Sequence, residues 1–428
     1  MKTQQAVAAV QPPVGTTPAQ ASPAQAQPAG ESSRLMLGLS AGHAAKHFCQ
    51  GSFLVLLPSI RNALGLSDVA VGGMYTAQHV VGGATNAPAG LLADMYRRRV
   101  ALILTASMTL VALGYLFIGL TNWYALLVLA VICTGAGTSL WHSPAFATLA
   151  ARYPDRRGLA MAAHLTGAQI GDTLAPVLTG LALGGVALIG VEWAGVHWRT
   201  VALALVVPAG LTAVMVITFF RSGGVGAPAR VSLGQYLSAL RRLGRNPGVL
   251  GMTALHAMRG ATHTSFQVFL VLYMSDVLLF SPLRVGLHVS LLTLAGVAST
   301  PVFGAVSDRI GRKPVILFNM TAVTGIVLSF VWIEGGWPFT VMIALLGVVL
   351  FSVMPTITAA AMDVTERGSE GTSIALMFAG GSVVGAVAPI VAGAINGSWG
   401  FQGVVLFASA IAAGGLLTAV AVPIRRRT

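Results

Sequence analysis

Apolar runs long enough to cross a lipid bilayer alternate with short polar segments along most of the chain. A transmembrane helix needs about 20 mainly apolar residues to cross the hydrocarbon core. The runs predict twelve such helices, at about 36–59, 69–92, 100–120, 123–150, 158–188, 200–220, 249–274, 285–306, 314–333, 338–361, 371–396 and 400–423. We therefore expect an all-α membrane protein.

The polar segments divide the chain into four parts. Residues 1–35 are rich in Ala, Pro and Gln and hold no apolar stretch like the core of a signal peptide, so we expect a disordered cytoplasmic tail. The longest internal polar segment, 221–248, is expected to be a cytoplasmic linker between two six-helix bundles. These bundles would occupy 36–220 and 249–424.

Composition excludes several classes of protein. Of the 428 residues, 55% are hydrophobic and 9% are charged, whereas about 25% of the residues in an average soluble domain are charged. A soluble core could not bury this much apolar surface, which excludes a soluble enzyme, a nucleic-acid-binding domain and a disordered protein. Cys49 and Cys133 both lie within apolar runs and are interpreted as buried structural thiols.

The placement of the basic residues predicts the topology. Of the 25 Lys and Arg, twenty fall in loops on the side of the two termini, and three, Arg61, Arg199 and Arg284, fall on the opposite side. Basic loops stay in the cytoplasm, so both termini are expected on the cytoplasmic side of the inner (plasma) membrane. Short basic clusters between apolar runs are topology signals, so no nucleic-acid partner is expected from the net charge of +13.

The two predicted bundles carry matching sequence. The segment GLLADMYRRR at 90–99 corresponds to GAVSDRIGRK at 304–313, at an offset of 214 residues. At an offset of 213, His43 corresponds to His256, Lys46 to Arg259 and Gly180 to Gly393. Six-helix halves repeated in parallel are one transporter architecture, with the substrate site between the halves near the midplane.

The repeated segment resembles the signature of the major facilitator superfamily, Gly-x-x-x-Asp-Arg-x-Gly-Arg followed by Arg or Lys. The copy at 304–313 matches it almost completely, whereas Met95 and Arg97 replace the Arg and the Gly in the first copy. This resemblance implies the major facilitator fold, with twelve transmembrane helices in two pseudo-symmetric six-helix bundles. It also implies transport by alternating access.

Within the superfamily the chain is most similar to the fosmidomycin-resistance group of exporters. The similarity lies in His43 and Gln50-Gly51, in GAGTS at 135–139 followed by His142, and in RGLA at 157–160. That group typically has an acidic residue just after a His-Pro pair in its fourth helix, where this chain has His142-Ser143-Pro144-Ala145. The resemblance implies export.

The signature segments also predict gates. Asp94 and Asp308 begin tight turns, and the arginines behind them can pair with these carboxylates or with the carbonyl ends of facing helices. Contacts of this kind can form in one conformation and break in another. The expected gating residues are Gly90, Asp94, Arg98, Gly304, Asp308, Arg309, Gly311 and Arg312. The alternative is that the basic residues only hold these loops in the cytoplasm.

Charges inside the predicted helices indicate a substrate site. A charge at mid-bilayer costs roughly 2.5–3.5 kcal/mol on insertion scales, so such residues usually face a cavity. Two predicted helices each carry a stripe of polar residues that the helical period places on one face. The stripes are His43, Lys46, His47 and Gln50 in the first predicted helix, and His256, Arg259, His263 and Gln267 in the seventh. Lys46 and Arg259 could together bind a carboxylate or phosphonate. The alternative is that each forms a structural pair with a residue of a neighbouring helix.

One acidic residue, Asp172, lies deep within a predicted helix and is the candidate proton-coupling group. His164 and His142 are further candidates, because histidine can exchange a proton near neutral pH. No spacing of histidines and carboxylates indicates a metal site. No phosphate-binding loop of the Gly-x4-Gly-Lys-Ser/Thr type is present, so ATP is not expected to drive transport directly.

The sequence therefore predicts a secondary active transporter of a small organic anion, preferably an exporter coupled to protons by antiport. The alternative is a proton-coupled uptake symporter for an organic anion. A membrane receptor or scaffold is disfavoured, because it needs neither duplicated gates nor midplane charges. An enzyme is not expected, and neither is a cofactor. The expected partners are a small anionic substrate, protons and the lipid bilayer, and the protein is expected to be a monomer.

Overall fold

The computed structural model describes residues 29–188, 191–220, 234, 238, 241–365 and 370–422, which are almost entirely helical. The first half contains α1 (Ala29–Leu64), α2 (Asp68–Met95), α3 (Val100–Leu120), α4 (Tyr124–Arg152), α5 (Arg157–Gly184), α6 (Trp198–Ala204) and α7 (Val206–Phe219). The second contains α9 (Pro247–Asp276), α10 (Pro282–Ile310), α11 (Arg312–Ser329), α12 (Gly336–Asp363), α13 (Glu370–Gly385) and α14 (Ala388–Ala421). We call these the N-half and the C-half.

The helices identify a membrane-embedded protein. Six segments of the described chain are long and apolar enough to span a bilayer: Val100–Leu120, Tyr124–Arg152, Trp198–Phe219, Pro282–Ile310, Gly336–Asp363 and Leu376–Ala421. Other long helices, such as α1 and α9, carry several polar residues, which lowers their apolar content. The number of twelve spans therefore stays a prediction.

Several expected boundaries differ from the observed ones. Helix α1 begins at Ala29, inside the segment 1–35 that was expected to be disordered. The expected helix 158–188 ends at Gly184, because Gly185 takes a positive φ of 67°. The chain then forms a hairpin in which β1 (Val186–Leu188) pairs antiparallel with β2 (Val191–Trp193). No strand had been predicted.

The expected helix 371–396 is also divided. Helix α13 ends at Gly385, and α14 begins at Ala388 with a proline in its first turn, where its missing N–H breaks no helical bond. Helix α14 then continues past Gly400, whose φ of 65° introduces a kink. The twelfth expected helix, 400–423, is the second arm of this kinked helix.

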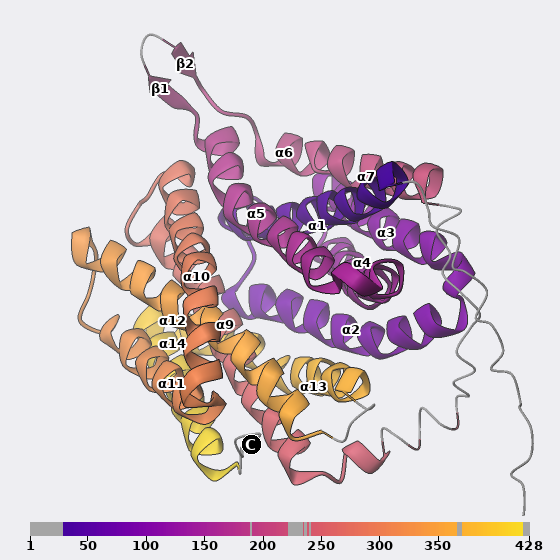
Figure 1. Ribbon diagram of the computed structural model, residues 1–428. Helices are drawn as coiled ribbons and strands as arrows, with labels where there is room; N and C mark the ends of the chain where they lie inside the picture. Colours follow the sequence, from indigo (N-terminus) through magenta and orange to yellow (C-terminus); the bar gives the residue numbers. More distant parts are fainter. Residues whose placement is uncertain are drawn as a thin grey trace, which may run out of the picture.

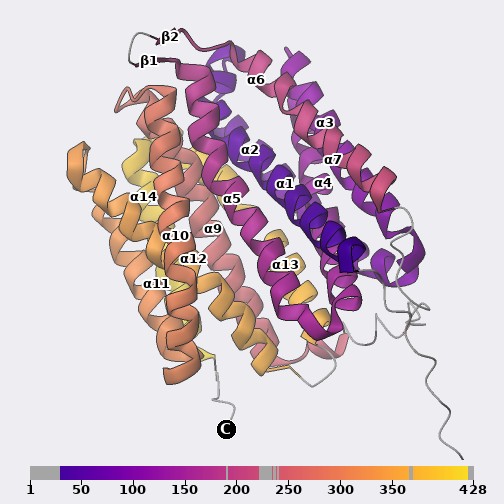
Figure 2. The ribbon, with the colours of Figure 1, turned by 45° about the horizontal axis from the view of Figure 1, so that its top comes forward.

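The two halves lie side by side, with α1–α7 on one side and α9–α14 on the other (Figures 1 and 2). Across the interface α5 packs against α10, and α2 packs against α13 and α14. These two contacts are equivalent under the repeat, because α2 corresponds to α10 and α5 corresponds to α13 with the start of α14. The duplication seen in the sequence therefore builds the contact between the halves.

The halves touch most closely near the hairpin. We call this end of the bundle the hairpin end and the opposite end, which carries Arg98, Arg152 and Arg312, the basic end. A Cβ on Gly72 would lie 2.2 Å from the carbonyl oxygen of Pro389, and a Cβ on Gly286 would lie 2.2 Å from that of Pro176. Only glycine permits such an approach of two backbones. These two glycines occupy equivalent places in the repeat and close the hairpin end.

A polar network joins the halves at the same end. Arg61 of α1 pairs with Asp68 at 2.8 Å and also with Asp276 at the end of α9. Asn396 of α14 donates a hydrogen bond to the second oxygen of Asp68 at 2.8 Å. Because Asp276 and Asn396 belong to the C-half, the two halves cannot separate at this end without breaking both contacts.

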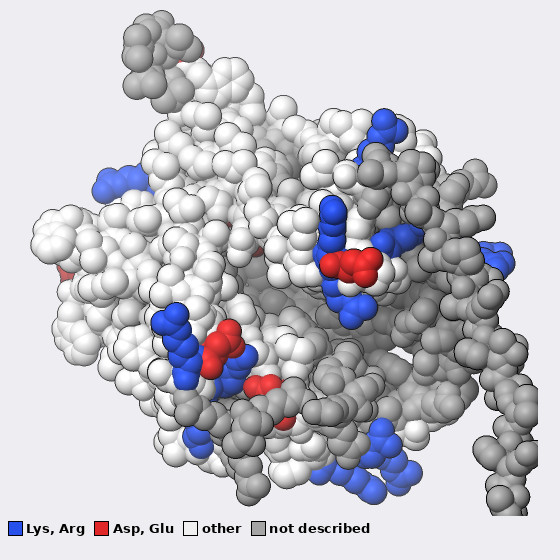
Figure 3. Space-filling model, in the orientation of Figure 1, with Lys and Arg blue, Asp and Glu red and all other residues white. Residues whose placement is uncertain are grey.

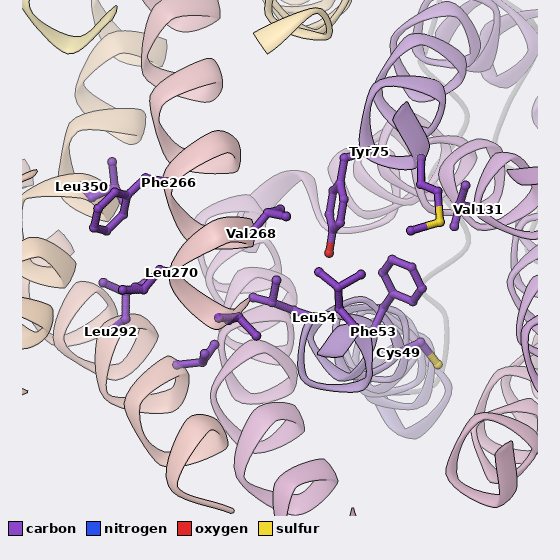
Figure 4. Close-up of a cluster of buried hydrophobic side chains, with 14 of the residues drawn as sticks. Cys49, Phe53, Leu54, Tyr75, Val131, Phe266, Val268, Leu270, Leu292 and Leu350 are labelled. Atoms are coloured by element: carbon purple, nitrogen blue, oxygen red, sulfur yellow. The ribbon is translucent and has the colours of Figure 1, made fainter. Parts of the chain in front are cut away.

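Apolar side chains fill the gap just inside this network. Leu54 of α1, Tyr75 of α2 and Val268 of α9 point toward one another across the boundary between the halves (Figure 4). Each is at most 8% exposed. They form a floor that separates the middle of the bundle from the hairpin end.

Within the N-half, α1 and α5 lie unusually close to each other. A Cβ on Gly167 would lie 2.2 Å from the carbonyl oxygen of Ser40, and a Cβ on Gly171 would lie 2.3 Å from that of Ala44. Small residues at an interface let two helix backbones approach within the membrane. This contact sets the distance between the polar side chains of α1 and those of α5.

The first prediction concerns the polar network. Replacement Asp276→Asn should weaken the closed hairpin end, because it removes an ion pair between the halves worth about 1 kcal/mol, or roughly a fivefold change in population. Spin labels at the exposed positions Trp123 and Val277 would report a larger share of long distances. Asp155→Asn is the control, since exposed Asp155 makes no ion pair among the described residues. An unchanged distance distribution would show that the network does not hold this end closed.

The second prediction concerns the α1–α5 contact. Gly171→Ala should lower the midpoint of thermal unfolding in detergent, because the new methyl group must push α1 away at a cost of about 1–3 kcal/mol. Gly260→Ala in α9 is the matched control, since a Cβ there meets no atom within 4 Å. Equal midpoints for the two variants would contradict the close approach.

Candidate functional site

A cavity of about 320 Å³ lies between the halves, on the basic-end side of the apolar floor. Helices α1, α2, α4 and α5 form one wall, and α9, α10, α12 and α13 contribute the other. The face shown in Figure 3 is hollowed near its centre, between two groups of charged side chains. A central cavity of this size can hold a small molecule.

Two hydrogen-bonded pairs stand on the N-half wall. The Lys46 ammonium lies 2.9 Å from Nε2 of His142, which joins α1 to α4. A protonated Lys46 donates this bond, so His142 accepts at Nε2 and carries its proton on Nδ1. Nδ1 of His47 lies 2.9 Å from Oδ1 of Asp172, which joins α1 to α5. All four side chains line the cavity.

Two further histidines lie behind this wall. Nδ1 of His43 is 2.9 Å from the carbonyl oxygen of His164, and their rings stack at 4.0 Å. Both residues are buried and neither is among the described residues that line the cavity. They continue the polar cluster into the α1–α5 interface, where the glycines of α5 bring the two helices together.

The C-half wall carries neutral polar groups. His263, Thr264 and Gln267 of α9 line the cavity, together with Thr293 of α10. Thr293 also lies 3.5 Å from the carbonyl oxygen of Asp172, so α10 contacts the backbone of that residue directly. This wall offers hydrogen bonds without a formal charge.

Arg259 does not join Lys46 at the cavity. Its Nη2 donates a hydrogen bond to the carbonyl oxygen of Leu350 in α12 at 3.0 Å. His256, expected on the same stripe, packs against Phe378 with ring centroids 5.0 Å apart. Neither residue is among the described lining residues, so the structure does not bring together the two-base clamp expected from the sequence. Gln50, His263 and Gln267 do reach the cavity.

The cavity includes residues that sequence reasoning did not select. His79 of α2 lies 3.3 Å from the hydroxyl of Thr264 and so bridges the two halves within the cavity. Gln78, Tyr75 and Phe351 also line it. His79 has no histidine at the equivalent place of the repeat, where the sequence has Leu292 and Thr293. Its position was therefore not marked by the duplication.

A metal site was not expected, yet three histidines come close together. Ring nitrogens of His43, His47 and His142 lie within 4.8 Å of one another. Three imidazoles are a common ligand set for zinc. The Lys46 ammonium, hydrogen-bonded to His142, would repel a divalent cation held there. The charges of this cluster therefore suit an anion or an exchangeable proton better than a metal ion.

Among the predicted gating residues, Arg312 forms ion pairs with two carboxylates of the C-half. Arg312 pairs with Asp308 at 2.5 Å and lies 3.6 Å from a carboxylate oxygen of Asp363. Gly311 ends α10 with a φ of 104°, a conformation that favours glycine. Gly304 lies one turn before Asp308, and Arg309 and Arg98 are exposed. Gly90 and Asp94 lie in α2, but their side chains fall outside the described residues. A gating role for this set stays a prediction.

Comparison with known proteins agrees with this architecture. The Major Facilitator Superfamily matches residues 39–377 and 250–428. The Fosmidomycin resistance protein of Escherichia coli (strain K12) is 22% identical over 329 residues, covering 76% of this chain and 77% of that protein.

Two solved structures share the fold at low sequence identity. A bacterial homologue of the human lysosomal transporter Spinster, inward-facing and unoccupied, has a TM-score of 0.74 and 14% identity, covering 92% of this chain and 96% of that chain. The nucleoside transporter NupG has a TM-score of 0.67 and 15% identity, covering 92% and 100%. The chain therefore belongs to the major facilitator superfamily of transporters, and it is not an enzyme.

Proposed function

We propose that this protein is a secondary active transporter that exports a small organic anion, of carboxylate or phosphonate type, in exchange for protons. Its twelve helices span the inner membrane, with the basic end and both termini in the cytoplasm. The substrate enters the cavity from the basic end and leaves when the hairpin end opens. The following observations support this proposal.

The observation that carries the proposal is the state of Lys46. Its side chain is 0% exposed, and it forms no ion pair with a carboxylate among the described residues. Its hydrogen-bond partner is the imidazole of His142, which carries no countercharge when neutral. A buried ammonium without a directly paired negative charge is costly. An anion bound in the cavity would supply that charge, so the site favours an anionic ligand.

The contacts between the halves support alternating access. Glycine contacts, the Arg61 network and the apolar floor close the hairpin end, whereas the cavity lies on the other side of this closure. Since the halves are repeats, the opposite state is reached by separating them at the hairpin end and bringing them together at the basic end. The Escherichia coli relative is named for resistance to a compound, and removing a compound from the cell is one way to resist it.

Asp172 is the proposed proton-coupling group. Its side chain is 33% exposed, so a proton can reach it from the cavity, and His47 is its hydrogen-bonded neighbour. His142 and His164 would extend this path along the same polar cluster. Protonation of Asp172 would remove the negative charge from its hydrogen bond with His47 and change the contacts between α1 and α5.

Uptake by proton symport is the second candidate, and one observation favours it. Lys46 and Asp172 share a wall, so protonating Asp172 makes that wall more positive. Proton binding would then increase the affinity for a simple anion, and this positive coupling is expected of a symporter. The direction of pH-driven flux in proteoliposomes separates the two candidates.

The third prediction concerns Lys46. Lys46→Gln should weaken binding of the transported anion about ten- to hundredfold, because it removes a charge-assisted hydrogen bond worth about 1.5–3 kcal/mol. Arg259→Gln is the matched control and should change binding by less than about threefold, since Arg259 faces α12. Binding would be measured by ligand-induced thermal stabilisation of purified protein. Equal losses in both variants would restore the two-base clamp, and no loss in either would reject an anion site at Lys46.

The fourth prediction concerns coupling. In proteoliposomes, Asp172→Asn should abolish substrate accumulation driven by a pH gradient, because the amide cannot exchange a proton at neutral pH. Substrate exchange without a gradient should continue and should lose its dependence on pH. If the variant still accumulates substrate against its gradient, Asp172 is not the coupling group.

A further inference from the structure

The described cavity wall carries one positive and one negative charge. Of the described lining residues, Lys46 and Asp172 have charged side chains, and the remainder are neutral polar, histidine or apolar. Arg259 lies outside the lining. With neutral histidines, the wall therefore has no net formal charge. A site with this balance matches a ligand that carries both charges more closely than it matches a simple anion.

The carboxylate is the more accessible of the two charges. The Asp172 side chain is 33% exposed, whereas Lys46 is 0% exposed. His47 binds Oδ1 of Asp172, and Oδ2 has no hydrogen-bond partner among the described residues. An incoming anion would meet this carboxylate, and the resulting repulsion would oppose its approach to Lys46. A cationic group on the same ligand would turn this repulsion into attraction.

The two charges also lie close together and on one side. Lys46 and His47 are consecutive residues of α1, and His47 is hydrogen-bonded to Asp172. The ammonium of Lys46 and the carboxylate of Asp172 therefore lie beside neighbouring residues of one helix. The facing wall presents Gln267, Thr264 and Thr293, which carry no charge. A ligand whose two charges are separated by a few bonds would bind the N-half wall, with its remaining polar groups toward α9 and α10.

From these observations we infer that the transported substrate is a zwitterion, an organic acid that carries an ammonium group a few bonds from its carboxylate or phosphonate. Lys46 binds the anionic group and Asp172 binds the ammonium through its unpartnered oxygen. This inference rests on the proposed function and specifies the substrate class of the same cavity.

The inference also predicts that substrate and proton compete for the protein, as antiport requires. A proton and an ammonium group are alternative partners of one carboxylate, so each displaces the other from Asp172. The titratable groups around Asp172 are His43, Lys46 and His47 of α1, His142 of α4 and His164 of α5, while α10 presents only the hydroxyls of Ser290 and Thr293. Of Asp172 and these groups, Asp172 carries the carboxylate, so it is the group for which a proton and the ammonium group compete directly.

Matched ligands test this inference without knowledge of the natural substrate. The probes are α-amino acids and α-aminophosphonates of three to six carbons, the same compounds with methyl in place of ammonium, and alkylamines of equal length. Thermal stabilisation of purified wild-type protein gives relative affinities. A pH-sensitive dye in weak buffer reports proton release on binding.

The zwitterions should bind about tenfold more tightly than their methyl counterparts, as expected for one charge-assisted hydrogen bond, and also more tightly than the alkylamines. Binding should release protons at acidic pH. In Asp172→Asn, a zwitterion and its methyl counterpart should bind with about equal affinity. Lys46→Gln should weaken the binding of both compounds. The wild-type comparison and the proton release do not depend on how well either variant folds.

Three outcomes would overturn the inference. Equal binding of zwitterions and methyl counterparts rejects the ammonium subsite and leaves the proposed anion transport in place. Equal binding of alkylamines and zwitterions assigns the cavity to cations. If no acid of either kind stabilises the protein, the proposed function fails together with this inference.

Discussion

The cost of placing charge in a hydrocarbon solvent governs the arrangement of this protein. Lys46 and Asp172 lie in the middle of long helices, where exposure to lipid would be strongly unfavourable. Both instead face a cavity between the halves, and each has a histidine partner on or beside that wall. The close approach of α1 to α5, permitted by Gly167 and Gly171, makes one of these pairs possible. The helix contact therefore determines the chemistry of the cavity.

The duplicated halves have kept their contacts and changed their cavity chemistry. Gly72 and Gly286 are equivalent, and both close the hairpin end through a backbone contact with a proline of the opposite half. Lys46 and Arg259 are also equivalent, yet Lys46 lines the cavity and Arg259 bonds to α12. The pseudo-symmetry therefore holds for the backbone contacts between the halves but not for the polar side chains of the cavity. The polar residues of the cavity can therefore differ between the two halves while both halves close the hairpin end through the same kind of contact.

The cavity lies on the basic-end side of the contacts that close the hairpin end. The side chains of Leu54, Tyr75 and Val268, which point toward one another (Figure 4), line the end of the cavity nearest the polar network of Arg61. At the basic end, the described residues of the signature segment pair within the C-half.

The sequence by itself determined the membrane class, the duplication and the helical faces that carry polar groups. These properties depend on composition and on the helical period, which are local. Of the side chains on the predicted face of the first helix, Lys46, His47 and Gln50 line the cavity, whereas His43 does not. The tertiary structure alone decided which polar groups meet. His142 and Asp172 lie 96 and 125 residues from their partners in α1, and no local spacing encodes those distances. The contact of Arg259 with Leu350 likewise depends on the packing of α9 against α12, so the repeat could not reveal it.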